Sequence, residues 1–275
     1  MTPSPTTLWL DLLFNFILLL GGGVVYFSLC WLAARRLNNY SIVDVAWSYG
    51  FALVGAYFFL LHFLGYNLPL PGLMMAGATI LWSLRLGTHL AVRVFGHLEQ
   101  EDGRYQKMRE TWGAQTPQKM WNFYMLQAVA LALLCLPLLA SAPFHGANAL
   151  HLWHWMGLGL VISAMLLEGL ADAQLSAFKK NPANRGKVCD LGLWNWSRHP
   201  NYFAEWLIWV GFWLLSYNES YWGLPGLLCA LIMYHLLTKV TGIPLTEQQL
   251  LKSKGEAYIV YQSRVSAFWP RPPKK

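Results

Sequence analysis

The sequence has little charge. Only 12% of its 275 residues are Asp, Glu, Lys or Arg, whereas 56% are hydrophobic. A soluble globular domain usually carries about 25% charged residues, and apolar runs of about twenty residues are long enough to cross a bilayer as helices. The shortage of charge therefore excludes an ordinary soluble protein and indicates a membrane protein.

Cysteine pairs and glycine loops are also missing. The four cysteines are scattered and form no C-x-x-C pair, so we predict neither a disulfide framework nor a zinc site. No G-x-G-x-x-G motif is present, which excludes a Rossmann-type phosphate loop. The glycines at 21–23 lie in an apolar run, where we expect close helix packing. His145, His151 and His154 lie away from every carboxylate of the expected spans, and we predict no metal ion.

Apolar segments predict seven membrane-spanning helices, at 10–34, 42–64, 71–94, 123–141, 152–178, 202–217 and 221–239. Because only YNES separates the last two, we expect a tight helical hairpin there. The first segment lacks the basic leading region and cleavage site of a signal peptide, so we expect it to remain as a span. The prediction is an all-α polytopic membrane protein. We expect one membrane domain over 1–275, with a catalytic and cofactor half at about 123–270.

The basic residues lie on one side. The 20 Lys and Arg lie at or after the ends of the first, third, fifth and seventh segments, at the start of the sixth or, for Arg85, well inside the third. By the positive-inside rule, the N-terminus is extracytoplasmic and the C-terminus is cytosolic. The polar stretches 95–122 and 179–201 and the tail from 240 are then cytosolic. Topology and attraction to anionic membrane lipid explain the net charge of +7. We expect a bacterial inner (cytoplasmic) membrane.

Ionisable residues inside a span cost roughly 2.5–3.5 kcal/mol each to insert, and besides Asp11, which we interpret as interfacial, we single out six of them. They are Asp44, Arg85, His89, Glu168, Asp172 and Glu205. All six fall in the cytosolic halves of their segments, which predicts one polar cavity that opens to the cytosol. Interhelical ion pairs that only hold the bundle together are the plain alternative. A proton or ion pathway is disfavoured, because the extracytoplasmic halves are nearly pure hydrocarbon.

Residues near this cavity suit a polar, phosphate-bearing co-substrate. The cations available to phosphate groups are Arg93, Arg104, Lys179, Arg185 and Arg198. Asp172 and Glu205 can accept hydrogen bonds from ribose hydroxyls or a carboxamide. The tyrosines Tyr202, Tyr258 and Tyr261 can stack on rings or form part of the interfacial belt. This pattern favours an enzyme that combines an apolar substrate with a cytosolic cofactor.

Several stretches resemble one known family. GLWNWSRHPNYFAEWLIWVGF, EGLADAQLSAFKKN and EAYIVYQSRVSAFWP, together with SIVDVAWSYGF, LRLGTHLAVR and EDGRYQKMR, are similar to the steroid 5-alpha-reductase family in its bacterial DUF1295-type branch. The resemblance covers about residues 41–270. It implies a seven-span enzyme that binds NADPH at its cytosolic half and reduces the carbon–carbon double bond of a 3-oxo-delta-4 steroid or related enone lipid.

The resemblance also implies cofactor residues. The family's Asn and Asp in the fifth span fall on Glu168 and Asp172, and the family's phosphate-side arginine seven positions later falls on Lys179, a basic substitute. The Asn-x-x-x-Glu pair of the sixth span is Asn201 and Glu205, and a tail histidine falls on Glu247. The first and last of these positions depart from the family. The remaining predicted cofactor residue is His199, from the RHPNY motif.

The substrate side is less determined. The Gln-Glu pair and tyrosine that hold the steroid oxygen in mammalian members are missing, and Asp44, Trp47 and Tyr49 occupy the corresponding region. Candidates for the acid that polarises the substrate carbonyl are Asp44, if burial keeps it protonated, Tyr49, or His89 supported by Arg85. The substrate is expected to enter from the bilayer. We expect no nucleic acid and no obligate protein partner.

Other functions remain open at this point. Isoprenylcysteine carboxyl methyltransferases and phospholipid methyltransferases carry a similar RHPxY…E motif and bind S-adenosylmethionine, so methyl transfer to a lipid is the main alternative. Transport and non-catalytic lipid binding are the others.

Overall fold

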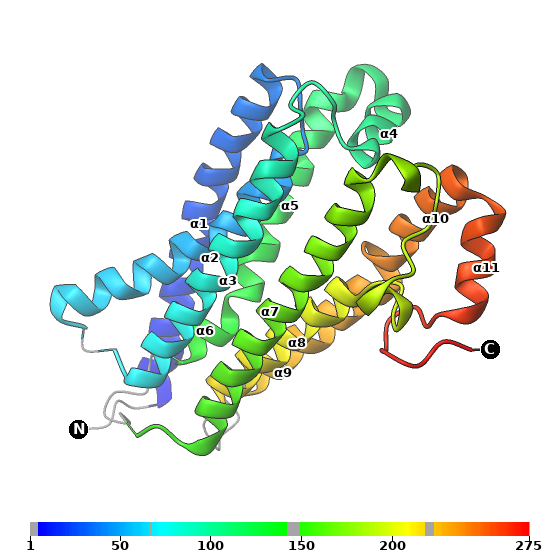
Figure 1. The fold of residues 1–275 in the computed structure, drawn as a ribbon. Coiled ribbons are helices and arrows are strands. Elements are labelled where there is room, and N and C mark those ends of the chain that lie inside the picture. Colours follow the sequence, from blue (N-terminus) through cyan, green and yellow to red (C-terminus); the bar gives the residue numbers. More distant parts are fainter. Residues whose placement is uncertain (1–4, 67, 142–148, 218–222, 275) are drawn as a thin grey trace. The chain divides into compact units, whose positions relative to one another are not determined.

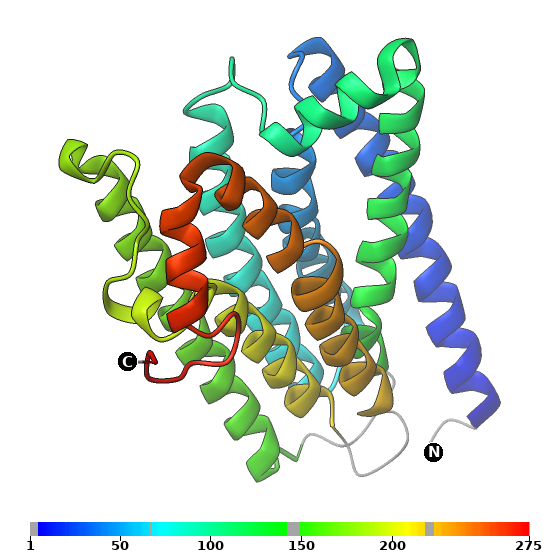
Figure 2. The ribbon, with the colours of Figure 1, turned by 90° about the vertical axis from the view of Figure 1, so that its right-hand side faces the viewer.

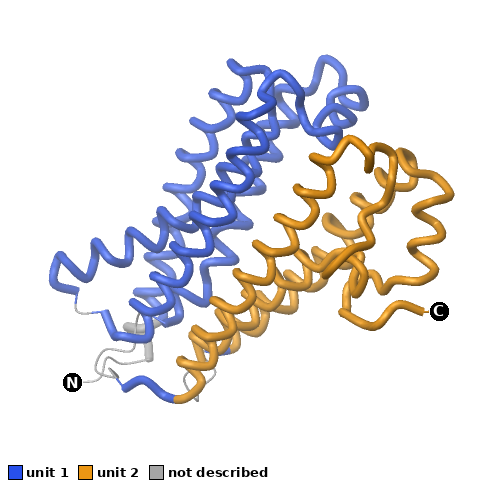
Figure 3. The backbone as a smooth tube through the Cα atoms, viewed as in Figure 1, with its two compact units in different colours: residues 1–151, 218–223 blue, residues 152–217, 224–275 orange. Residues whose placement is uncertain are grey.

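A computed structural model describes residues 5–66, 68–141, 149–217 and 223–274. Its regular structure over these ranges is helical, and no strand occurs in them. The chain divides into two compact units, residues Met1–His151 with Asn218–Gly223, and Leu152–Tyr217 with Leu224–Lys275. Figure 1 labels the helices, and Figure 3 colours the two units.

The first unit contains six α-helices: α1 (Pro5–Arg36), α2 (Ile42–Leu61), α3 (Leu70–Phe95), α4 (Gly103–Trp112), α5 (Thr116–Leu134) and α6 (Leu136–Ser141). Helix α2 packs against α3, and α1 packs against α5. The short α4 lies across the ends of these helices and leads into α5 (Figure 2). The sequence had predicted 95–122 only as a polar stretch.

Small residues bring α2 and α3 close together. A Cβ at Gly55 would lie 2.9 Å from the carbonyl oxygen of Ala76, and a Cβ at Gly87 would lie 2.8 Å from the ring of Tyr49. Side chains larger than glycine would force the two helices apart at both points. The core of this unit includes the fully buried rings of Phe27, Phe51, Phe58, Trp82 and Tyr124.

The second unit is built from α7 (Leu152–Lys180), α8 (Pro200–Ser216), α9 (Leu224–His235), α10 (Ile243–Lys254) and α11 (Glu256–Arg264). Helix α8 packs on both α7 and α9. Gly157 and Gly211 let α7 and α8 approach closely. A Cβ on Gly157 would lie 2.8 Å from the Gly211 oxygen, and one on Gly211 would lie 3.0 Å from the Gly157 oxygen.

The tail is more ordered than the sequence predicted. Helix α9 runs through a π-helical turn (Leu236–Val240) and a break at Gly242 into α10. Gly255, with a φ of 56°, then turns the chain into α11. The left-handed conformation at this position favours glycine. The seventh segment, expected to end at 239, thus ends at the last residue of the π-helical turn, Val240, and α10 is a separate helix.

Among the described residues, five stretches are long and apolar enough to cross a membrane: Trp9–Arg36, Ile42–Tyr66, Gly103–Ser141, Leu152–Lys180 and Leu224–Lys254. They agree with a multi-pass membrane protein. The other two expected spans are helices as well, but α3 contains Arg85, His89 and Arg93, and α8 has only 17 residues. The count of seven spans and the orientation of the termini stay predictions. Of the YNES turn between the last two expected spans, only Tyr217 is among the described residues.

Candidate functional site

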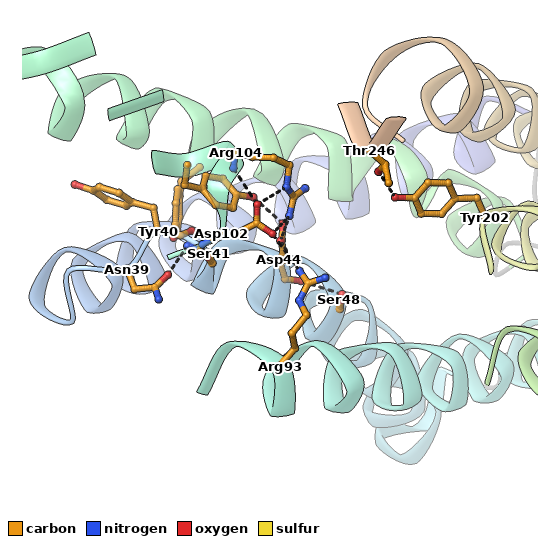
Figure 4. Close-up of polar contacts among 12 residues, drawn as sticks. Asn39, Tyr40, Ser41, Asp44, Ser48, Arg93, Asp102, Arg104, Tyr202 and Thr246 are labelled. Atoms are coloured by element: carbon orange, nitrogen blue, oxygen red, sulfur yellow. Dashed lines mark hydrogen bonds and ion pairs between the residues drawn. The ribbon is translucent and has the colours of Figure 1, made fainter. Parts of the chain in front are cut away.

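Polar side chains of the first unit gather around Asp44, in the first turn of α2. Its oxygen Oδ1 accepts a hydrogen bond from the Tyr105 hydroxyl at 2.7 Å, and Oδ2 accepts one from Nη2 of Arg104 at 2.6 Å. Nη2 of Arg93 lies 3.6 Å from the same Oδ2. Figure 4 shows both arginines pointing at this carboxylate. These residues together with Asp102 are called the Asp44 cluster.

Asp102 joins this cluster to the start of α4. Its Oδ1 accepts hydrogen bonds at 3.0 Å from both the backbone N–H and Nε of Arg104, so it acts as the N-cap of the helix. Burial alone raises the pKa of this carboxyl, but the hydrogen bonds and charge of Arg104 outweigh burial and hold the pKa below its ordinary value. Asp102 is therefore ionised at neutral pH.

A second pair ties the neighbouring loops together. Glu101 accepts hydrogen bonds from Nε of Arg109 at 2.6 Å and from the backbone N–H of Tyr40 at 2.6 Å. The guanidinium of Arg109 lies 4.5 Å from the centre of the Tyr40 ring. The connection between α1 and α2 is thereby fixed to the connection between α3 and α4.

The other predicted catalytic residues also lie in the first unit, on α2 and α3. The Tyr49 hydroxyl is 3.1 Å from Oγ1 of Thr88. Arg85 is half-buried on α3, and His89, one turn further along, is exposed. The four residues predicted as catalytic thus come from two helices that pack against each other.

In the second unit, polar side chains converge on Glu247 of α10. Its Oε1 accepts hydrogen bonds from Nε of Arg198 at 2.7 Å and from Tyr258 at 3.3 Å, and lies 3.2 Å from Nε2 of His199. Its Oε2 accepts a hydrogen bond from Gln262 at 2.8 Å. These five residues are called the Glu247 cluster. They join the start of α8 to α10 and α11.

Arg198 has further protein partners. Its Nη1 donates to the carbonyl oxygens of Gln262 at 3.0 Å and Val265 at 2.6 Å, and its side chain is only 11% exposed. Next to it, the hydroxyl of Tyr261 donates to the carbonyl oxygen of Trp194. Burial raises the pKa values of Tyr258 and Tyr261, so both hydroxyls are protonated donors.

His199 lies at the start of α8 with a side chain that is 2% exposed. Burial lowers its pKa below the ordinary value, although the contact with Glu247 acts in the opposite direction. The ring of Tyr202 stacks on it with 5.2 Å between centroids. The Tyr202 hydroxyl is 3.0 Å from Oγ1 of Thr246, on α10 (Figure 4).

Two acidic residues of α7 and α8 accept hydrogen bonds from side chains of α8. Nδ2 of Asn201 donates to Oδ1 of Asp172 at 3.4 Å, and Nε1 of Trp209 donates to Oε1 of Glu205 at 2.9 Å. Glu168, one turn before Asp172, is buried. The amide oxygen Oδ1 of Asn201 is buried and accepts no hydrogen bond from any described residue.

Comparison with known proteins identifies the family of the chain. A family model described as "Protein of unknown function (DUF1295)" matches residues 30–265. The chain belongs to the DUF1295 family. An uncharacterized protein of Schizosaccharomyces pombe is 30% identical over 289 aligned residues, which cover 94% of this chain and 78% of that protein. No solved structure matches.

In this DUF1295 chain, the predicted residues fall into three groups. The catalytic candidates, with Arg93 and Arg104, lie in the first unit. Arg198, His199, Tyr202, Glu247, Tyr258, Tyr261, Asn201, Asp172, Glu205 and Glu168 lie in the second unit. Lys179 and Arg185 are exposed at and after the end of α7. The single cavity predicted from the six ionisable residues would need both units and stays a prediction.

Sequence reasoning missed Asp102, Tyr105, Thr246 and Gln262 as partners of predicted residues. For Asp102 a local signal existed, because an Asp two residues before Arg104 and at the start of a polar helix is a common N-cap. For Tyr105, Thr246 and Gln262 no local pattern marks the partner. Their contacts join residues 61, 44 and 15 positions apart.

Proposed function

We propose that this DUF1295 protein is an NADPH-dependent reductase of the carbon–carbon double bond in an apolar enone, with 3-oxo-delta-4 steroids as the model substrates. The relation of DUF1295 to steroid 5-alpha-reductase-like proteins supports the proposal. The apolar helices support a substrate that reaches the site from the bilayer.

The unused oxygen of Asn201 is the observation that carries the cofactor assignment. Because Nδ2 donates to the Asp172 carboxylate, the amide orientation is fixed by its partner, and Oδ1 must be the free acceptor. A buried acceptor without a donor is unfavourable. The carboxamide and ribose hydroxyls of NADPH are donors that fit this oxygen and the neighbouring carboxylate of Asp172.

Phosphate binding then falls to cations near the end of α7. Arg198 already has protein acceptors on Nε and Nη1, whereas Lys179 and Arg185 are exposed. We assign the phosphates mainly to Lys179 and Arg185. In this assignment Arg198 holds the start of α8 in place for Asn201.

The contacts also separate the candidates for the acid that polarises the substrate carbonyl. Both oxygens of Asp44 already accept hydrogen bonds from the protein, one from Tyr105 and one from Arg104, so this side chain is engaged within its own cluster. Tyr49 and His89 remain as donors toward a substrate carbonyl. When bound, NADPH supplies a hydride, and the chain's task is to orient the enone and stabilise the charge that develops on its oxygen.

A ligand-dependent melting experiment tests the function. Detergent-solubilised protein is heated with NADPH, NADH or S-adenosylmethionine, because a ligand that binds only the native state raises the apparent melting temperature. We expect the largest shift with NADPH and NADPH-dependent loss of androst-4-en-3-one. A shift with S-adenosylmethionine alone would replace the reductase by a methyltransferase.

A further inference from the structure

The indole nitrogen of Trp47 is a buried donor that the protein does not use. Nε1 is inaccessible to solvent and has no hydrogen-bond partner in the described part of the chain. An indole N–H can donate but cannot accept. Buried polar groups in native proteins almost always have a partner, and each exception calls for an explanation.

The ring of Trp47 is held so that this N–H has a fixed direction. Phe51 meets the ring nearly edge-on, with 4.8 Å between centroids, and Trp82 meets it with 6.4 Å between centroids. Phe51 and Trp82 are 1% and 0% exposed. Because both neighbours are fixed in the core, the indole cannot easily rotate toward another acceptor of the chain.

The backbone that carries Trp47 is fixed as well. The Ser83 hydroxyl donates to the carbonyl oxygen of Ser48 and accepts a hydrogen bond from the backbone N–H of Ala52 at 2.8 Å. A side chain of α3 is thus inserted into the ladder of α2, immediately after Trp47. A donor positioned on a locked helix pair is preorganised for a ligand.

The same helix pair carries the predicted catalytic residues. Trp47 contacts Trp82, and Asp44, almost one turn before Trp47, lies near Arg93. The stretch of α3 between Trp82 and Arg93 therefore runs past the stretch of α2 between Asp44 and Trp47. Arg85 and His89 lie on this stretch of α3, so the unused donor lies in their neighbourhood within the first unit.

We propose that the N–H of Trp47 binds the neutral oxygen of an apolar ligand, a ketone or hydroxyl group. The indole carries no charge and the two rings that hold it, Phe51 and Trp82, are aromatic, so its immediate surroundings suit a neutral oxygen on an apolar ligand. The choice of an enone as the ligand rests on the proposed function. The hydrogen bond itself does not require that the ligand be reduced.

Two matched probes test this hydrogen bond without turnover. Androst-4-en-3-one and androst-4-ene share a ring skeleton and differ by one ketone. Their affinities are measured for protein in nanodiscs without cofactor, after subtraction of binding to empty nanodiscs. In Trp47→Phe we expect about fivefold weaker binding of the ketone, and less than about twofold change for the hydrocarbon.

The control is Trp206→Phe. Trp206 also has a buried indole nitrogen without a partner among the described residues, but it lies on α8 in the second unit. Its replacement should change neither affinity. If Trp47→Phe does not fold, replacement of Trp47 by 3-benzothienylalanine removes the N–H and nearly preserves the shape of the ring.

The inference is overturned if the unaltered protein does not prefer the ketone, if it binds neither probe, or if the Trp47 variants weaken both probes equally or neither. Failure of the proposed reductase function would give a different experimental result. Ketone-selective binding that depends on Trp47, with no NADPH-dependent turnover, would remove the proposed reaction and leave the role of Trp47 intact.

Discussion

The Asp44 and Glu247 clusters both join segments that are distant in the sequence, but they differ in their exposure to solvent. In each, one carboxylate accepts hydrogen bonds from arginine and tyrosine and joins segments far apart in the sequence. The Asp44 cluster is more exposed to solvent. The side chains of Arg104 and Arg93 are 33% and 50% exposed, whereas that of Arg198 in the Glu247 cluster is 11% exposed. Charge pairs are worth more, and broken pairs cost more, where water is excluded.

Both clusters contrast with the neutral groups nearby. The charged residues that first drew attention as ligands are largely paired with one another, whereas Nε1 of Trp47 and Oδ1 of Asn201 have no partner among the described residues. This difference separates two roles. The paired charged residues fix the helix ends, and the neutral atoms of Trp47 and Asn201 are the ones that we propose as ligand contacts beside the exposed Lys179 and Arg185.

The largest expected loss of stability comes from a change in the Glu247 cluster, which is the less exposed of the two. Arg198→Ala leaves the Glu247 carboxylate without its main counter-charge and frees two carbonyl oxygens, so we expect a loss of roughly 3–5 kcal/mol in the free energy of unfolding. Thermal melting in detergent measures the loss, with the exposed Arg185→Ala as the control. An Arg198→Ala protein of normal stability with weakened NADPH binding would instead make Arg198 a phosphate ligand.

In the more exposed Asp44 cluster, loss of one charge should cost less stability. Asp44→Asn keeps the size of the side chain but removes the charge that faces Arg104, which still has Asp102 as a partner. We expect a loss of about 1–3 kcal/mol in the free energy of unfolding. Asp11→Asn, near the start of α1, should change little. If Asp44→Asn costs as much as Arg198→Ala, exposure does not separate the two clusters.

Asn201 should affect binding more than stability. Asn201→Ala removes an acceptor that has no donor in the described structure, so its loss should weaken NADPH binding about five- to tenfold and shift the melting temperature only slightly. Titration of NADPH by calorimetry measures the affinity, and exposed Asn122→Ala serves as the control. Unchanged affinity in a folded Asn201→Ala protein would remove Asn201 from the cofactor site.

The smallest expected effect is a pH dependence from His199. Because burial lowers its folded-state pKa, the unfolded chain binds a proton more readily as pH falls below about 6.5, its ordinary value. Stability should therefore fall from pH 6.5 toward pH 5, and less steeply in His199→Gln. Melting curves of both proteins across this range give the comparison. Parallel curves would mean that His199 does not titrate differently on folding.

The sequence by itself determined the helical, membrane type of the fold and the helices that carry the ionisable residues. Apolar runs of spanning length leave the backbone no alternative to helix in a bilayer, and the i, i+4 spacing of Asn201 and Glu205 placed them on one helical face together with Trp209, which hydrogen-bonds Glu205.

Only the tertiary structure decided which of these residues are already occupied. The pairing of Asp44 with Tyr105, of Glu247 with Arg198, and the isolation of the Trp47 N–H depend on contacts between segments that are distant in the chain. Periodicity gives the face on which a side chain lies, but a hydrogen bond requires two atoms within about 3 Å of each other. That distance is fixed by how closely the helices pack, as the glycine and serine contacts of α2 and α3 illustrate.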